Sequence, residues 1–291
     1  MKRVRLLALV ALFAPAVAGA YARTTVPGTK VCLHLPERTV SWAAASPLGA
    51  DLPDELALAA LRRSFAVWEA ERCSDLAFIE GPRCSPVVGF ETRGENTTTV
   101  VFRRGRCREV VPSGDPCWRE ESCANDYGCW DGDDRQIAIT TTTFSSCSGV
   151  ILDSDIEFNA AGYRFTVVDG PPCGASSAGD CVDTDLENTL VHEIGHVIGL
   201  DHSSDRDATM YASAPGGETK KRDLGKDDRE AICAIYPAGG ATAICEPAAS
   251  CPPLRSGGSA SGCGAAGSGP AAAGCAAVAA VALALRIRRR R

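Results

Sequence analysis

The chain has few histidines, few methionines and no cysteine pair of the CxxC type. Only four histidines and two methionines occur in 291 residues, and one of the methionines is the initiator. Without CxxC pairs, the 15 cysteines do not resemble metal clusters. A formal net charge of −6, with positive charge concentrated only in the last few residues, argues against nucleic-acid binding. A hydrophobic content of 45 % fits a globular protein with a proper core.

Residues 1–22 have the pattern of a secretory signal peptide. Basic residues come first, followed by a short apolar run from Leu6 to Phe13 and then by small residues. An uncleaved membrane helix is disfavoured, because the run is short and Pro15 interrupts it. Cleavage could follow any of the alanines at positions 18, 20 and 22. We therefore expect an exported, extracellular or cell-surface protein.

Export gives the cysteines an oxidising environment, in which they are expected to form disulfides. Residues 103–135 are rich in Cys, Gly and Asp and suggest an irregular insertion closed by such bonds. The spacing allows short loops to be closed by three pairs: Cys73–Cys84, Cys173–Cys181 and Cys245–Cys251.

Hydrophobic periodicity predicts both strands and helices. Strands are expected at residues 39–44, 87–91, 98–102, 136–144 and 151–159. Helices are expected at residues 53–71, from residue 184 through the histidine-rich stretch, and at residues 226–236. Thr184 and Glu187 have the spacing of a capping box at the start of the second helix. Residues 238–262, rich in Ala, Gly, Ser and Pro, suggest a flexible linker.

Three of the four histidines lie within the sequence HEIGHVIGLDH, residues 192–202. On a helix, His192 and His196 share one face and can bind the same ion. Imidazole nitrogens suit zinc in a tetrahedral site. Glu193, on the neighbouring edge of that face, can take a proton from a water molecule at the ion without being a ligand.

His202 can reach the same ion only if the helix ends before it. Ten further residues of helix would move the side chain about 15 Å along the axis. Gly199 stands where a break is needed, and glycine adopts the left-handed conformation that ends helices. The spacing therefore predicts three zinc ligands: His192, His196 and His202.

The motif HExxHxxGxxH resembles that of the metzincin metallopeptidases, matched here at His192, Glu193, His196, Gly199 and His202. Metzincins also place a methionine beneath the metal, and ATMYA supplies Met210. Ser203 and the run DLGKDDREAICAIYP resemble the matrixins, the matrix-metalloprotease branch, whereas the alanine at position 212 departs from the branch that uses a tyrosine ligand.

The resemblance implies an α+β catalytic domain over residues 23–237. It would contain a twisted mixed sheet, an active-site helix, a second long helix and a C-terminal helix. The resemblance also implies one catalytic zinc, protein or peptide substrates, and an extended peptide paired with the strand at residues 136–144. The alternative interpretation is that residues 136–144 form an ordinary sheet strand with no substrate-binding role.

The chain departs from the matrixin pattern in three ways. Only His34 lies outside the cluster, so we expect no second, histidine-bound structural zinc. Cys84 follows the first helix instead of preceding the domain, so we interpret it as a disulfide cysteine and not as the cysteine of a prodomain. Third, the spacing of the acidic residues clearly reproduces neither an EF-hand loop nor the calcium pattern of the family. Calcium is a candidate cofactor, but we favour solvated loop carboxylates as the interpretation of these residues: Asp131, Asp133, Asp134, Asp153 and Asp155.

Residues 263–291 resemble the C-terminal sorting signals of myxobacterial surface proteins. Cys263 precedes a weakly apolar run, Ala271 to Leu285, which is followed by arginines. This pattern predicts membrane attachment through the tail, with a plain tail anchor as the alternative.

The sequence as a whole predicts an exported zinc endopeptidase that cleaves extended polypeptides. The alternative is a non-catalytic surface binding or adhesion module that zinc stabilises. Glu193 argues against this alternative, because a structural zinc site needs no base beside its ligands.

Overall fold

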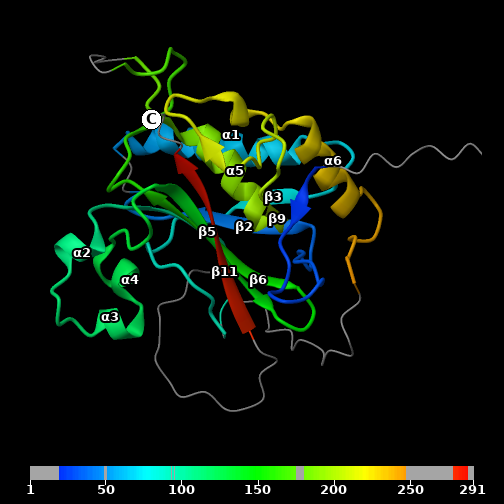
Figure 1. Ribbon diagram of the computed structural model, residues 1–291, viewed down its shortest axis with the longest axis horizontal. Coiled ribbons are helices and arrows are strands. Elements are labelled where there is room, and N and C mark those ends of the chain that lie inside the picture. Colours follow the sequence, from blue (N-terminus) through cyan, green and yellow to red (C-terminus); the bar gives the residue numbers. More distant parts are fainter. Residues whose placement is uncertain are drawn as a thin grey trace, which may run out of the picture.

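The computed structural model describes residues 20–48, 51–92, 94, 96–174, 180–246 and 278–287. Residues 1–19 of the expected signal peptide and the tail cysteine Cys263 lie outside these residues. A central sheet has the helices α1 (Asp54–Glu69) and α5 (Leu186–Val197) on one side, and α6 (Lys226–Ile235) stands beside them (Figure 1). In the part of the chain that is described, no helix combines the length and the hydrophobicity needed to cross a membrane.

The main sheet has seven strands in the order β10-β11-β5-β6-β4-β2-β3. The strand β5 runs antiparallel to both of its neighbours, and the other neighbouring pairs are parallel. The predicted α+β architecture with a mixed sheet is therefore confirmed. The strand bounds are β10 (Ser213–Ala214), β11 (Val278–Ile287), β5 (Gln136–Ser145), β6 (Ile151–Asn159), β4 (Thr98–Arg103), β2 (Thr39–Ala44) and β3 (Ala77–Glu80).

Two short sheets complete the topology. The strand β1 (Ala22–Arg23) pairs antiparallel with β9 (Leu200–Asp201), directly after the histidine-bearing helix. The strand β7 (Phe165–Thr166) pairs in parallel with β8 (Thr184–Asp185), directly before that helix. Both ends of α5 are therefore held by strand pairs.

The strand predicted at residues 87–91 does not form. Gly89 has φ +121°, and its N–H donates to the Asp155 carboxylate at 2.6 Å. The N–H and C=O groups of Val88 both bond to the side chain of Asn125. Side chains thus replace the main-chain partners that a strand would need. The strands β3 and β11 were not predicted, because neither segment shows a clear alternation.

The start of α5 is set by Asp185, not by Thr184. The Asp185 carboxylate accepts the N–H of Asn188 at 2.8 Å, as an N-cap does. Thr184 is in β8, opposite Phe165, and Glu187 pairs with Arg63. The predicted capping box is therefore wrong, and the N-cap lies one residue later, because Thr184 is held in an extended conformation by pairing in β8.

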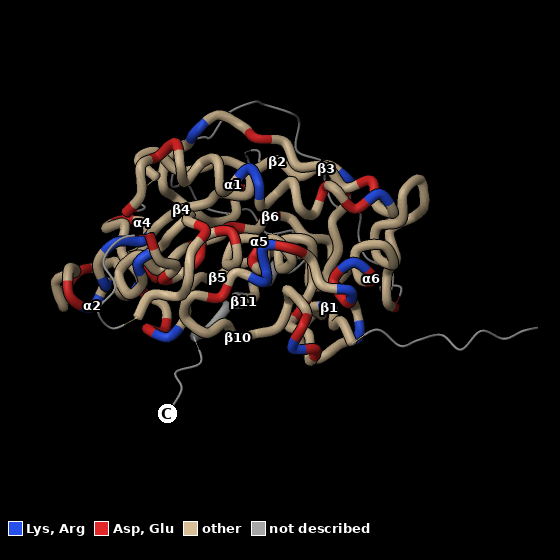
Figure 2. The backbone as a smooth tube through the Cα atoms, turned by 90° about the horizontal axis from the view of Figure 1, so that it is seen from above, with Lys and Arg blue, Asp and Glu red and all other residues tan. Residues whose placement is uncertain are grey.

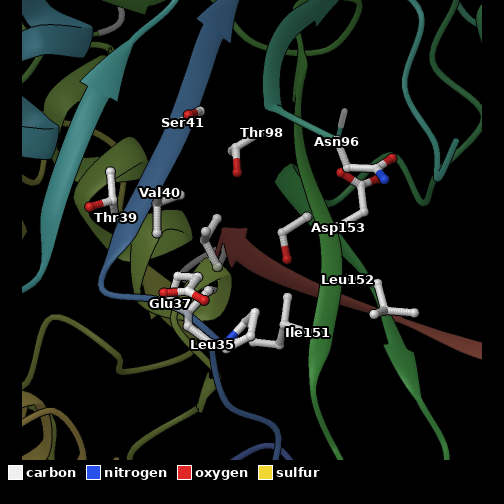
Figure 3. A pocket seen from close by; sticks show the side chains of 13 residues that line it. Leu35, Glu37, Thr39, Val40, Ser41, Asn96, Thr98, Ile151, Leu152 and Asp153 are labelled. Carbon is white, nitrogen blue, oxygen red and sulfur yellow. The ribbon is translucent and has the colours of Figure 1, made fainter. Parts of the chain in front are cut away.

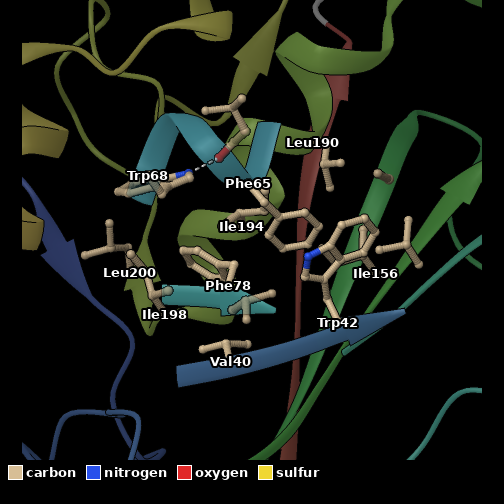
Figure 4. Close-up of a cluster of buried hydrophobic side chains, with 14 of the residues drawn as sticks. Val40, Trp42, Phe65, Trp68, Phe78, Ile156, Leu190, Ile194, Ile198 and Leu200 are labelled. Atoms are coloured by element: carbon tan, nitrogen blue, oxygen red, sulfur yellow. Dashed lines mark hydrogen bonds between the residues drawn. The ribbon is translucent and has the colours of Figure 1, made fainter. Parts of the chain in front are cut away.

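The core joins α1, α5 and the sheet (Figure 4). The predicted stripe of α5 is fully buried, at Leu186, Leu190, Ile194 and Ile198. Trp42 of β2 stacks on Phe65 of α1, with ring centroids 4.4 Å apart. The indole of Trp68 donates to the carbonyl of Val191 at 2.8 Å, which fixes α1 against α5 at the level of the histidines. A buried Trp normally finds such a partner.

The cysteine-rich insertion contains three short helices instead of an irregular loop: α2 (Cys107–Val110), α3 (Cys117–Glu120) and α4 (Cys123–Tyr127). The disulfides Cys107–Cys129 and Cys117–Cys123 join them. Acidic and basic residues lie near one another around α2 (Figure 2). The buried guanidinium of Arg103 donates to Glu157 and to the carbonyl of Ala124, which ties the insertion to the sheet.

Two long-range disulfides, Cys32–Cys245 and Cys73–Cys233, link sequence positions 213 and 160 residues apart. These pairings show that the predicted Cys73–Cys84 and Cys245–Cys251 bonds are wrong, whereas Cys173–Cys181 is confirmed. The bond at Cys245 also holds the first part of the expected linker, where Arg23 and Arg38 donate to main-chain carbonyls. Residues 238–246 therefore continue the domain.

A cavity of about 160 Å³ lies between β2 and β6, and Asp153 is part of its lining (Figure 3). None of the three clustered histidines lines this cavity. Burial raises the pKa of Asp153 to about 6 and that of the neighbouring Asp155 well above its ordinary value. Asp155 has a structural role, because its carboxylate also accepts the N–H of Thr99 at 2.8 Å.

Asp153→Asn should remove one source of pH dependence in stability. The stabilising contribution of a carboxyl whose folded-state pKa is raised is present below pH 3.8 and is lost as pH rises through about 6. Relative to wild type, the free energy of unfolding of the variant should therefore rise by on the order of 3 kcal/mol across this window. Urea denaturation at several pH values measures this difference, and parallel pH profiles would contradict the prediction.

Candidate metal centre and peptide cleft

Three histidine side chains converge at the end of α5. His192 and His196 lie one turn apart on this helix, and His202 follows the helix. One ring nitrogen from each lies within 4.8 Å of the others. The ring of His202 lies 5.3 Å from that of His192 and 4.9 Å from that of His196, measured between centroids. The three side chains can therefore bind one ion.

Gly199 produces this convergence. Its φ of +88° ends the helix, and its N–H donates to the carbonyl of His196 at 3.0 Å. A Cβ at this position would lie 2.8 Å from the carbonyl oxygen of Leu33. Both the left-handed backbone and the close approach require glycine. The predicted turn is confirmed.

Hydrogen bonds orient the two helical imidazoles. The Nδ1 atom of His192 lies 2.7 Å from the carbonyl oxygen of Thr209, and that of His196 lies 2.8 Å from that of Leu200. Donation from Nδ1 leaves the Nε2 lone pair for a metal. The Nε2 atoms of His192 and His196 are buried and have no hydrogen-bond partner among the described residues.

Burial also keeps these imidazoles neutral. Burial lowers the pKa of His192 well below its ordinary value and that of His196 to about 3. Neutral imidazole is the form that coordinates metal. Three converging nitrogen donors, two of them oriented and neutral, fit zinc and leave a fourth coordination position open.

Glu193 is fully buried beside the histidines, and β5 holds its carboxylate. The hydroxyl of Thr140 donates to Oε2 of Glu193 at 2.6 Å. Sequence reasoning missed Thr140, because a strand with four consecutive threonines gives no sign of which one reaches the helix. This contact joins the sheet directly to the site.

Met210 packs against α5 at Gly195 and is 1 % exposed. A Cβ at Gly195 would lie 2.2 Å from the sulfur of Met210, so the glycine between the two histidines admits this side chain. The Asp228 carboxylate accepts the N–H groups of Thr209 at 2.6 Å and Met210 at 3.0 Å. Asp228, at the start of α6, thus holds in place the turn that contains Thr209 and Met210, the methionine turn. This role of Asp228 was not predicted from the sequence.

A buried lysine positions the segment that follows the methionine. Lys221, in the 3₁₀ helix η1 (Lys220–Arg222), donates from Nζ to the carbonyl oxygens of Tyr211 and Ser213. Burial lowers the pKa of Lys221 to about 8. The lysine therefore fixes β10 at the edge of the main sheet, next to the metal centre.

The acidic residues considered for calcium do not form a cluster of this kind. Among the described residues, the three histidines are the only group of three potential ligands close enough to hold one ion. Asp133 pairs with Arg135, and Asp134 pairs with Arg106 and Arg108. Calcium binding stays an untested prediction.

Comparison with known proteins agrees with this geometry. Residues 120–237 match the matrixin family model. This stretch is similar to matrixins. Metalloendoproteinase 5-MMP of Arabidopsis thaliana is 52% identical over 52 residues, which cover 18% of this chain and 14% of that protein. Metalloendoproteinase 1 of Glycine max is also 52% identical over 52 residues, covering 18% of this chain and 17% of that protein.

The chain thus spans less than a fifth of the length of these curated relatives. The residues that match the family model nevertheless include α5, the methionine turn and α6. The matches support a matrixin-type metalloendopeptidase domain in this part of the chain, and the family implies zinc.

Gly195→Ala should destabilise the domain through the contact with Met210. The added methyl group overpacks the space beneath the histidines, which should cost about 1–3 kcal/mol. In a Met210→Ala background the same substitution should cost much less, because the clashing sulfur is gone. Urea denaturation of the four proteins in this double-mutant cycle measures the coupling, and strictly additive effects would argue against the contact.

Proposed function

We propose that this protein is an exported zinc endopeptidase that hydrolyses peptide bonds of extended polypeptides. One observation carries the proposal: three imidazoles converge beside a buried glutamate that is not part of their donor set. A structural zinc site would not need this carboxylate, and the alternative of a non-catalytic binding module leaves it without a role.

The residues of the site divide into two roles. His192, His196 and His202 would hold the ion, with Nδ1 of the first two fixed by the carbonyl oxygens of Thr209 and Leu200. Zinc, when bound, supplies a Lewis acid that polarises the scissile carbonyl and acidifies water. Met210 and Gly195 would support the ion from below without coordinating it.

Glu193 would carry the proton. Its carboxylate takes a proton from the attacking water and then delivers this proton to the nitrogen of the departing amine. The Thr140 hydroxyl, bonded to Oε2, fixes the orientation of the carboxylate during both transfers. Burial at this point also excludes competing water from the carboxylate.

The substrate would bind as an added strand. The edge of β5 runs past Glu193, and an extended peptide can pair with such an edge through its main chain, independently of sequence. Several disulfides among the described residues fit an extracellular protein. Surface attachment through residues 263–291 is part of the same proposal and rests on the sequence pattern of the tail.

Glu193→Gln should reduce peptide hydrolysis by about 10²–10⁴-fold, because the amide cannot accept the proton. Zinc content should stay near one ion per chain, since the ligands are unchanged. His196→Ala should instead lower the zinc content together with the activity. Metal analysis and cleavage of a fluorogenic peptide library measure both quantities. Wild type that holds zinc but cleaves nothing would favour the binding-module alternative.

Thr140→Val should lower kcat by about tenfold, because it removes a hydrogen bond to a charged carboxylate while keeping the size of the side chain. Thr140→Ser, which retains the hydroxyl, should keep most of the activity. Zinc content should be equal in both variants and in wild type. If kcat of Thr140→Val equals that of wild type, Thr140 does not position Glu193.

A further inference from the structure

The edge of β5 that faces the active site is already paired with another part of the chain. Residues Val278–Ile287, from the expected sorting tail, form β11 antiparallel to β5. The pairing runs from Val278 opposite Ser145 to Arg286 opposite Gln136. On its other side, β11 lies parallel to β10. The strand order therefore places β11 between β5 and β10, and Figure 1 shows β11 as the red strand on the sheet.

The middle of β11 lies at the level of the catalytic glutamate. Leu283 is opposite Thr140, the residue whose hydroxyl bonds to Glu193. Val281 packs against the hydrophobic core, and β11 as a whole contacts α5. The strand therefore passes through the region where the proposed function places the scissile peptide.

Occupation of this edge by β11 and by a substrate is mutually exclusive. A strand edge has one set of outward N–H and C=O groups, and β11 uses this set along nearly the whole length of β5. On the other side of β11, the segment β10, held by Lys221, pairs with Arg286 and Ile287 at its end. A substrate peptide therefore has to displace β11 before it can pair with β5.

We propose that residues 278–287 act as a built-in competitive inhibitor that keeps the peptide cleft closed until the tail is displaced or removed. The proposal rests on the proposed peptidase function, whose active site it regulates. An exported protease of this kind would stay latent while its own tail is in place. Separation of the tail from the domain would then expose the edge of β5 and activate the enzyme.

The composition of β11 suits a reversible inhibitor. Four of its ten residues are alanine, as the sequence VAAVALALRI shows, so it offers less apolar surface for burial than a strand of larger side chains. Binding would therefore depend on the tether, which can raise the effective concentration of a segment into about the millimolar range. The same strand, once cut from the chain, would compete only weakly with substrate.

The test uses the full chain with Ala282→Pro and Leu283→Pro together. Successive residues of a strand point their N–H groups to opposite edges, so one of the two prolines removes a bond to β5 whichever residue donates. If β11 blocks the cleft, kcat/KM for a fluorogenic peptide should rise about tenfold or more, because the open fraction rises. The control places the same pair of prolines at Ala272 and Ala273, before β11, and should leave kcat/KM at the wild-type value.

Hydrogen exchange of the β5 amides gives a readout that does not depend on activity. In wild type, amides that face β11 should be protected, and in the Ala282/Leu283 variant they should exchange faster while those that face β6 stay protected. Equal exchange and equal kcat/KM in wild type and variant would overturn the proposal. Zinc binding and faster exchange of β5, without peptide cleavage by wild type or by the variant, would contradict the peptidase function. The same result would still support the pairing of β11 with β5.

Two further measurements complete the test. Specific activity of wild type should not change on dilution, because the inhibitor belongs to the same chain; a rise would show that β11 comes from a second copy and would overturn the intramolecular arrangement. The mass of zinc-loaded wild type should stay constant during incubation. Cleavage within 278–287 that is absent in Glu193→Gln would show that β11 is a substrate, which also overturns the proposal.

Discussion

The left-handed turn at Gly199 is the constraint on which the metal centre depends. It ends α5 after two histidines have reached one face, and it sends the chain back so that the third can meet them. The turn is held from several directions. Thr24 donates its N–H to the Gly199 carbonyl, and the hydroxyl of Tyr236 donates to the carbonyl of Ile198. Segments close to both ends of the described domain thus stabilise one turn.

The support beneath the histidines has the same long-range character. Gly195 leaves room for Met210, and Asp228 of α6 fixes the backbone of the methionine turn. The disulfide Cys73–Cys233 joins α6 to the segment after α1, and Trp68 of α1 bonds to α5. These contacts connect α1, α5, the methionine turn and α6 to one another. The imidazoles are therefore positioned by several elements of the domain and not by one helix alone.

In the proposed function, the edge of β5 is the surface that binds the substrate. An open strand edge accepts any extended peptide, including another protein molecule. In this structure β11 covers the edge and β10 lies beyond it. In the proposed function the main-chain groups of this edge bind the substrate, so β11 would both shield an open edge and restrain the peptidase.

The sequence by itself determined the local chemistry. The spacing of His192, Glu193, His196 and His202 follows from the helical repeat, and the need for Gly199 follows from the reach of a helix. The core stripe of α5 and the long strands β5 and β6 also follow from short-range periodicity. Each of these depends on neighbours within about one or two helical turns, so the sequence pattern contains the information.

Only the tertiary structure decided which distant groups meet. The roles of Thr140, Asp228 and Lys221 depend on contacts across many intervening residues, and a threonine or an aspartate carries no local sign of them. The partners predicted for Cys73 and Cys245 were wrong for the same reason, since spacing does not determine pairing. The tail, interpreted from composition as an anchor, pairs with β5 because an open strand edge can accept almost any extended segment, whatever its sequence.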